Sequence, residues 1–100
     1  MKFIQTHIEA IRRLCAIHKV KKLFVFGSVL TSRFNEKSDI DLLVDFNPDI
    51  DLYDYADNYF GLKDAFERLF GREVDLIEDR GIKNPLFRRN IDSHKQLIYG

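Results

Sequence analysis

The chain has 100 residues, of which 45% are hydrophobic and 13% aromatic, so it can build one buried core but not two. We therefore expect a single domain over residues 1–100. Charged residues make up 32% of the chain and cancel to a net charge of zero, a composition that excludes disordered and collagen-like proteins.

Neither a membrane segment nor a disulfide is expected. The best apolar run, residues 23–26, is far shorter than the roughly 20 residues of a membrane span. Cys15 is the single cysteine, so no internal disulfide can form. Together with the lack of a signal-peptide stretch, this predicts a cytoplasmic protein with no membrane partner.

The charges are segregated along the chain. Residues 1–22 hold six Lys or Arg and one acid, residues 39–57 hold seven Asp and no base, and residues 80–100 hold five bases and one acid. An acidic middle disfavours a groove for nucleic-acid backbone and favours bound cations, so we expect no direct nucleic-acid binding. A solvated acidic face is the alternative explanation.

The first predicted element is a helix from about residue 7 to residue 18. It follows a capping box at residues 6–9, and its apolar residues recur at helical spacing. The β-prone apolar run 23–26 predicts a strand buried on both faces. This strand ends in a turn at Gly27 and Ser28.

The middle of the chain contains a strand and the longest helix. Residues 29–33 predict one or two helical turns, and residues 34–38 a loop. Alternating side chains over residues 39–46 predict a second strand. An amphipathic helix over 51–70 carries a Leu and aromatic stripe that we assign to the core, with Gly71 as its C-cap. The aromatic residues left for a partner surface are Tyr53, Phe60 and Phe70.

The last part of the chain predicts a third short strand over residues 73–78. A helix follows from Pro85 to about residue 93, with Asn84 as its cap, and a closing strand over residues 96–99. Helices and strands thus alternate along the chain. This order predicts an α/β fold in which helices pack against a small mixed sheet.

Three acidic residues stand on strands that are otherwise apolar. Asp39 and Asp41 are two residues apart, so both carboxylates leave the same face of their strand, and Asp75 stands inside the third strand. If these strands are neighbours, the three carboxylates can form an oxygen site for Mg²⁺ or Mn²⁺. Surface ion pairs are the alternative explanation for any one of the three.

Gly27 and Ser28 form a candidate phosphate site. Glycine lets the backbone approach a ligand closely, and the following amides and the Ser28 hydroxyl can donate hydrogen bonds to phosphate. On its own, a Gly-Ser pair after a strand is also a common turn.

The combined pattern is more specific than its parts. It consists of Gly27-Ser28, ten intervening residues, and Asp39-x-Asp41, with a strand before the glycine and a strand around the acids. This pattern resembles the signature of the polymerase-β-like nucleotidyltransferase superfamily, and the chain is similar to its minimal nucleotidyltransferase branch over most of its length. The resemblance implies the fold of that superfamily.

The resemblance also implies roles for these residues. Asp39 and Asp41 would bind two Mg²⁺ ions (Mn²⁺ could replace them), and Asp75 would complete the site of the ion that activates the attacking hydroxyl. Gly27 and Ser28 would hold the β- and γ-phosphates of ATP. The implied reaction is in-line transfer of AMP from ATP to a hydroxyl.

One segment departs from the family pattern. Many relatives carry Arg within the stretch that follows Gly-Ser, whereas residues 29–32 are Val-Leu-Thr-Ser. Arg33 and Lys37 are the remaining bases before Asp39. We take Arg33 as a candidate nucleotide contact, with a solvated loop charge as the alternative.

The resemblance implies a protein partner as well. Minimal nucleotidyltransferases are commonly paired with HEPN-domain ribonuclease toxins and act as antitoxins that AMPylate a toxin tyrosine. Three alternatives stay open: a non-catalytic antitoxin that masks its partner, a small-molecule nucleotidyltransferase, and a homodimer formed through the partner surface. Arg88 and Arg89 are further candidate contacts for a partner or for the nucleotide.

Overall fold

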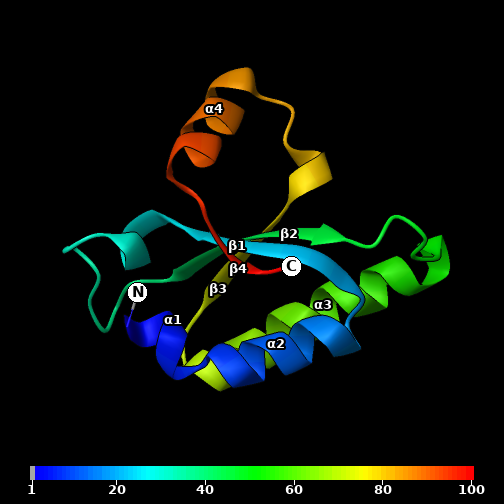
Figure 1. Ribbon diagram of the computed structural model, residues 1–100, viewed down its shortest axis with the longest axis horizontal. Helices are drawn as coiled ribbons and strands as arrows, with labels where there is room; N and C mark the ends of the chain where they lie inside the picture. The colour runs from blue at the N-terminus through cyan, green and yellow to red at the C-terminus, as the bar shows by residue number, and fades with distance from the viewer. Residues whose placement is uncertain (1) are drawn as a thin grey trace.

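The computed structural model describes residues 2–100, which form one sheet with helices on both sides (Figure 1). The order of the strands in the sheet is β3-β2-β1-β4, with β1 antiparallel to both neighbours and β2 parallel to β3. The predicted α/β class with a small mixed sheet is therefore confirmed. The strands are β1 (Val20–Phe26), β2 (Ile40–Phe46), β3 (Val74–Glu78) and β4 (Gln96–Tyr99).

Four α-helices accompany the sheet. They are α1 (Lys2–Thr6), α2 (Ile8–Ile17), α3 (Leu52–Phe70) and α4 (Pro85–His94). The first three lie on one side of the sheet and α4 stands on the other (Figure 1). Short 3₁₀ helices, η1 (Gly27–Leu30) and η2 (Asp79–Gly81), follow β1 and β3. The three predicted helices agree with α2, α3 and α4 to within one residue at each end. Within residues 2–100, no helix is long and apolar enough to cross a membrane.

Two local predictions in the first third of the chain are wrong. The Thr6 hydroxyl does not cap α2 but donates to the carbonyl oxygen of Lys2 at 2.9 Å, within the unpredicted helix α1. A Thr hydroxyl competes in this way for a carbonyl four residues earlier, and His7 takes the N-cap position without a side-chain bond. The helical turns expected at 29–33 form earlier, as η1, because the backbone at Thr31 is extended.

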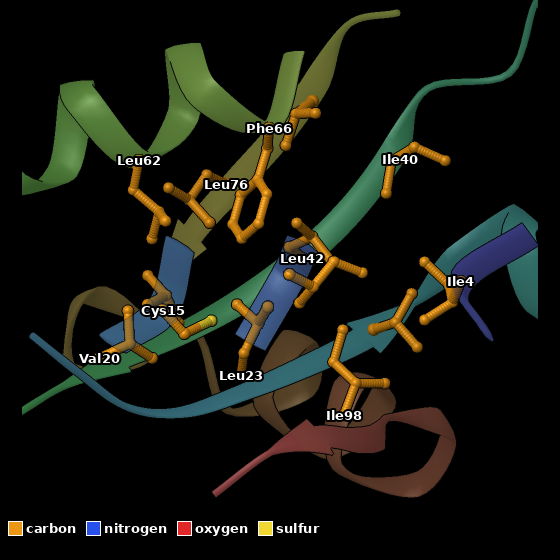
Figure 2. Close-up of a cluster of buried hydrophobic side chains, with 14 of the residues drawn as sticks. Ile4, Cys15, Val20, Leu23, Ile40, Leu42, Leu62, Phe66, Leu76 and Ile98 are labelled. Atoms are coloured by element: carbon orange, nitrogen blue, oxygen red, sulfur yellow. The ribbon is translucent and has the colours of Figure 1, made fainter. Parts of the chain in front are cut away.

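One face of the sheet forms the main core against α2 and α3 (Figure 2). Alternate strand residues point into this core, and Leu23 and Leu42 are fully buried there beside Leu62 and Phe66 of α3. The intervening strand residues, Asp41 among them, must point to the opposite face. The sheet therefore separates the core from the face that carries the acidic residues.

The long helix buries less of its stripe than the sequence predicts. Leu52, the first residue of the predicted amphipathic stripe, is 89% exposed. Phe70, expected to be free for a partner, is only 8% exposed because α1 covers it, with the rings of Phe3 and Phe70 5.5 Å apart. Tyr53 and Phe60 are exposed, as expected.

Candidate functional site

Strand pairing brings the candidate site residues to one end of the sheet. In the antiparallel register of β1 and β2, Phe26 lies opposite Asp41, and in the parallel register of β2 and β3, Asp41 lies opposite Asp75. Asp39 directly precedes β2, two residues before Asp41. The strands that carry the acids are thus neighbours, which is the arrangement on which a shared metal site depends.

Gly27 lies against the side chain of Asp41. Its φ angle is +79°, in the region that favours glycine, and a Cβ atom at this position would lie 2.1 Å from Oδ2 of Asp41. Only glycine meets both conditions. The turn after β1 therefore places the backbone of Gly27, which carries no side chain, against the carboxylate of Asp41.

The neighbouring carboxylates act on Asp41. The pKa of Asp41 is raised, first by partial burial and then by the negative charges of Asp75 and Asp39. Within residues 2–100, none of the three forms an ion pair. By contrast, Asp45 on the same face of β2 pairs with Arg80 at 3.6 Å. This end of the sheet thus holds negative charge that the described chain does not neutralise.

The donors at this end suit a hard divalent cation, although they do not enclose one by themselves. In the described part of the chain, no group of three His, Cys, Asp or Glu side chains is close enough to hold a metal ion. Mg²⁺ commonly takes one or two carboxylates and completes its shell with water and substrate phosphates. Asp39 and Asp75 are exposed and Asp41 is half-buried, so their oxygens can reach an ion that a bound phosphate helps to hold.

Ser28 directly follows Gly27 in η1, whereas Arg33 has no side-chain partner in the site within residues 2–100. The Ser28 carbonyl accepts bonds from the amide and the hydroxyl of Thr31, each at 2.9 Å, while its own hydroxyl makes no hydrogen bond within residues 2–100. Arg33 is exposed, and its backbone amide donates to the Thr31 hydroxyl at 3.2 Å. Its role as a nucleotide contact stays a prediction.

A cavity of about 540 Å³ adjoins the acidic site between η1, α4 and β4. This volume lies within the range of small-molecule sites, roughly 300–1,000 Å³. Gly27 lines the cavity and also lies against the side chain of Asp41. The lining residues are Phe26, Gly27, Leu30, Thr31, Asn90, Ile91, Ser93, His94 and Gln96.

Two arginines have roles that the sequence did not indicate. Arg72 donates from Nη1 to the carbonyl oxygens of Asn35 and Ser38, both at 2.9 Å, in the loop before Asp39. Arg88, a candidate contact for a partner or nucleotide, instead donates to the side chain of Asp79 at 2.8 Å and to its carbonyl at 2.6 Å. No spacing or neighbouring residue distinguishes either arginine from a solvated charge in the sequence.

Comparison with known proteins gives matches over most of the chain. Residues 7–98 match the nucleotidyltransferase domain family. A Methanocaldococcus jannaschii protein assigned as a protein adenylyltransferase is 40% identical over 82 residues, which cover 82% of this chain and 78% of the relative. The protein adenylyltransferase MntA of Thermococcus cleftensis is 31% identical over 100 residues, which cover 92% and 94% of the two chains.

Solved structures share the fold. A structure described as a minimal nucleotidyltransferase superposes with a TM-score of 0.69 at 34% identity and covers 95% of this chain and 92% of its own. A toxin–antitoxin structure with AMP-PNP gives 0.71 at 19% identity, over 93% and 73% of the chains. A complex of a tri-AMPylated Shewanella oneidensis HEPN toxin with its MNT antitoxin gives 0.66 at 18% identity, over 96% and 71%. At these low identities, the last two show the fold alone.

Proposed function

Because the chain belongs to the nucleotidyltransferase domain family, as a minimal nucleotidyltransferase of the polymerase-β-like superfamily related to the MntA antitoxins, we propose that it transfers AMP from ATP to a protein hydroxyl. Relatives named as protein adenylyltransferases support this class of reaction. The proposed acceptor is a tyrosine of a HEPN-domain toxin, for which the chain serves as antitoxin.

The observation that carries the proposal is the set of unpaired carboxylates beside the Gly27 turn. Asp41 stands between Asp75 on one neighbouring strand and the backbone of Gly27 on the other side. A carboxylate that is partly buried, as Asp41 is, normally finds a cationic partner, as Asp45 does with Arg80. The lack of such a partner at Asp41, next to two further acids, supports a binding site for cations, and the adjacent backbone amides suit the phosphates that such cations accompany.

Each residue then has a definite task. Asp39 and Asp41 would hold the cations, Asp75 would complete the site of the cation that activates the acceptor hydroxyl, and the Gly27-Ser28 backbone binds the β- and γ-phosphates. The acceptor oxygen bonds to the α-phosphorus while the bond from that phosphorus to the β-phosphate oxygen breaks, and pyrophosphate leaves. A carboxylate oxygen of Asp75 takes the proton of the hydroxyl. Bound Mg²⁺ would lower the pKa of that hydroxyl and neutralise the charge of the leaving group.

The test uses the HEPN protein encoded beside this chain, when one is present, as acceptor. The two proteins are incubated with ATP and Mg²⁺, and intact mass and peptide mapping then locate any added AMP. We expect the modification on a tyrosine with the wild type, and none when Asp39→Asn and Asp41→Asn are combined. Asp64→Asn is the matched control, because this exposed carboxylate on α3 pairs with Arg68, 3.1 Å away.

Other outcomes assign another function. Neutralisation of the toxin without any added AMP would indicate an antitoxin that masks its partner by binding. Efficient adenylylation of small alcohols, with an unmodified HEPN protein, would indicate a small-molecule nucleotidyltransferase.

A further inference from the structure

We propose that Arg72 is a positioning residue that fixes the backbone of Asp39 relative to that of Asp75, and thereby sets the affinity of the acidic site for divalent cations. This inference rests on the proposed function of the three carboxylates. Arg72 does not touch substrate in this account. It acts through the two backbone segments on which Asp39 and Asp75 stand.

The contacts of Arg72 join these two segments directly. Its Nη1 donates to the carbonyl oxygens of Asn35 and Ser38, each at 2.9 Å, and Ser38 is the residue before Asp39. Arg72 itself lies three residues before Asp75, at the entrance to β3. One guanidinium group therefore links the loop that leads into β2 to the segment that leads into β3.

The loop that Arg72 binds is itself well defined. The Ser38 amide donates to the Asn35 carbonyl at 3.1 Å, the Asn35 amide to the Ser38 hydroxyl at 3.1 Å, and the Lys37 amide to Asn35 Oδ1 at 2.8 Å. Residues 35–38 thus form a closed turn. Because the turn is internally bonded, an arginine that holds two of its carbonyls also determines where Asp39 starts.

Aromatic rings hold the guanidinium in place. Its carbon lies 4.8 Å from the ring centroids of both Phe3 and Phe34, a distance typical of cation–π contacts. Phe34 precedes the turn and Phe3 belongs to α1, which explains why this short helix matters to the site. Lysine lacks the planar guanidinium group that stacks on the rings, and it lacks the fixed fork of donors that arginine presents to two carbonyls. It is therefore a poor substitute for Arg72.

The test measures binding of Mn²⁺ alone to the full chain at 25 °C, from the loss of the electron paramagnetic resonance signal of free Mn²⁺. Arg72→Met keeps much of the side-chain volume between the rings and removes every donor. Residues that orient metal ligands typically contribute about 10–100-fold to metal affinity, so we expect at least a tenfold rise in the Mn²⁺ dissociation constant. Arg68→Met, on the exposed side of α3, should leave it unchanged.

A purely structural role predicts a different result. In that case Arg72→Met would lower the melting temperature but leave the dissociation constant for Mn²⁺ at the wild-type value, which overturns the inference. If Arg72→Met does not fold, Arg72→Lys decides, because wild-type affinity in that variant has the same meaning. Failure of the wild type to bind Mn²⁺ and to transfer AMP would refute the proposed function instead.

Discussion

Gly27 and Gly71 have similar backbone conformations in different surroundings. Their φ angles are +79° and +66°. Gly71 ends α3 as predicted, with its amide donating to the Glu67 carbonyl at 2.9 Å, and a Cβ atom there would have no heavy atom within 4 Å. At Gly27 a Cβ atom would collide with the carboxylate of Asp41. Comparison of the two glycines therefore distinguishes the effect of a positive φ angle, which they share, from the effect of close contact with Asp41, which only Gly27 makes.

We predict that Gly27→Ala is more destabilising than Gly71→Ala. Both variants put a side chain at positive φ, which costs about 1–2 kcal/mol, and only the first must also displace Asp41. Urea unfolding of the two variants gives the free energies of unfolding, and Mn²⁺ titration shows whether the site survives. Equal losses of stability, with Mn²⁺ binding intact in both, would contradict the close approach of Gly27 to Asp41.

The charge of Asp41 should work against folding when no cation is bound. Its pKa is raised by partial burial, by Asp75 and by Asp39, so the folded chain binds the proton more tightly than the unfolded chain. The penalty is absent below the pKa of the unfolded carboxyl, grows as pH rises toward the folded pKa, and is complete above that value.

Accordingly, Asp41→Asn should raise the melting temperature of the metal-free protein by a few degrees near neutral pH and by less at about pH 4. Asp45→Asn is the control, because it removes the ion pair with Arg80 and should not stabilise the protein. Melting curves across this pH range, in the presence of a chelator, provide the measurement. A lower melting temperature for Asp41→Asn at neutral pH would mean that a cationic group of the chain compensates this carboxylate.

At the scale of elements, the sequence predicted the helices and strands whose apolar residues recur at a regular period. It missed the helix that depends on contacts between distant residues. The burial period of α3 and the alternation in β2 are local, and both elements lie where they were expected. α1 is only five residues long and gains its stability by packing Phe3 on Phe70 and Arg72, contacts that join distant parts of the sequence. The sequence left open whether the strands of Asp41 and Asp75 are neighbours, and only the fold implied by the family resemblance favoured it. The role of Arg72 depends on bonds to residues more than 30 positions away, which no sequence pattern marks.

Capping of α4 gives a prediction at this scale. Asn84 Oδ1 accepts hydrogen bonds from the amides of Leu86 and Phe87, at 2.8 and 3.2 Å. Asn84→Ala should therefore lower the free energy of unfolding by about 1 kcal/mol. Asn58→Ala, which removes a side-chain bond inside α3 rather than a cap, should change it less. Urea unfolding compares the two, and an equal effect would show that the cap does not stabilise α4.

In the molecule as a whole, the hydrophobic core lies on one face of the sheet and the candidate site lies on the other. The buried cluster lies with α2 and α3, and Cys15 is fully buried within it. Burial raises the pKa of the Cys15 thiol to about 12, so the thiolate that reacts with alkylating agents is scarce in the folded protein. Because Cys15 is the one cysteine of the chain, its reactivity reports on opening of the core.

We predict that iodoacetamide labels Cys15 slowly in the native protein, and that Mn²⁺ slows the labelling further. A cation that binds only the folded form at a hundred times its dissociation constant should reduce the open population, and hence the labelling rate, by about 100-fold. The variant that combines Asp39→Asn and Asp41→Asn should lose this protection. Labelling that is equally slow with and without Mn²⁺ in the wild type would count against cation binding at the acidic end of the sheet.

The parallel pairing of β2 and β3 also determines when the site can form during folding. Strands that pair in parallel need a long crossover, and here α3 lies between them in the chain. β1 and β2, which are closer in sequence, bring Gly27 and Asp41 together earlier, because contacts between nearby segments form faster than distant ones. In a refolding chain, Gly27 and Asp41 therefore come together before β3 pairs with β2 and adds Asp75 to the site. Competence for AMP transfer should be among the last properties to return after denaturation.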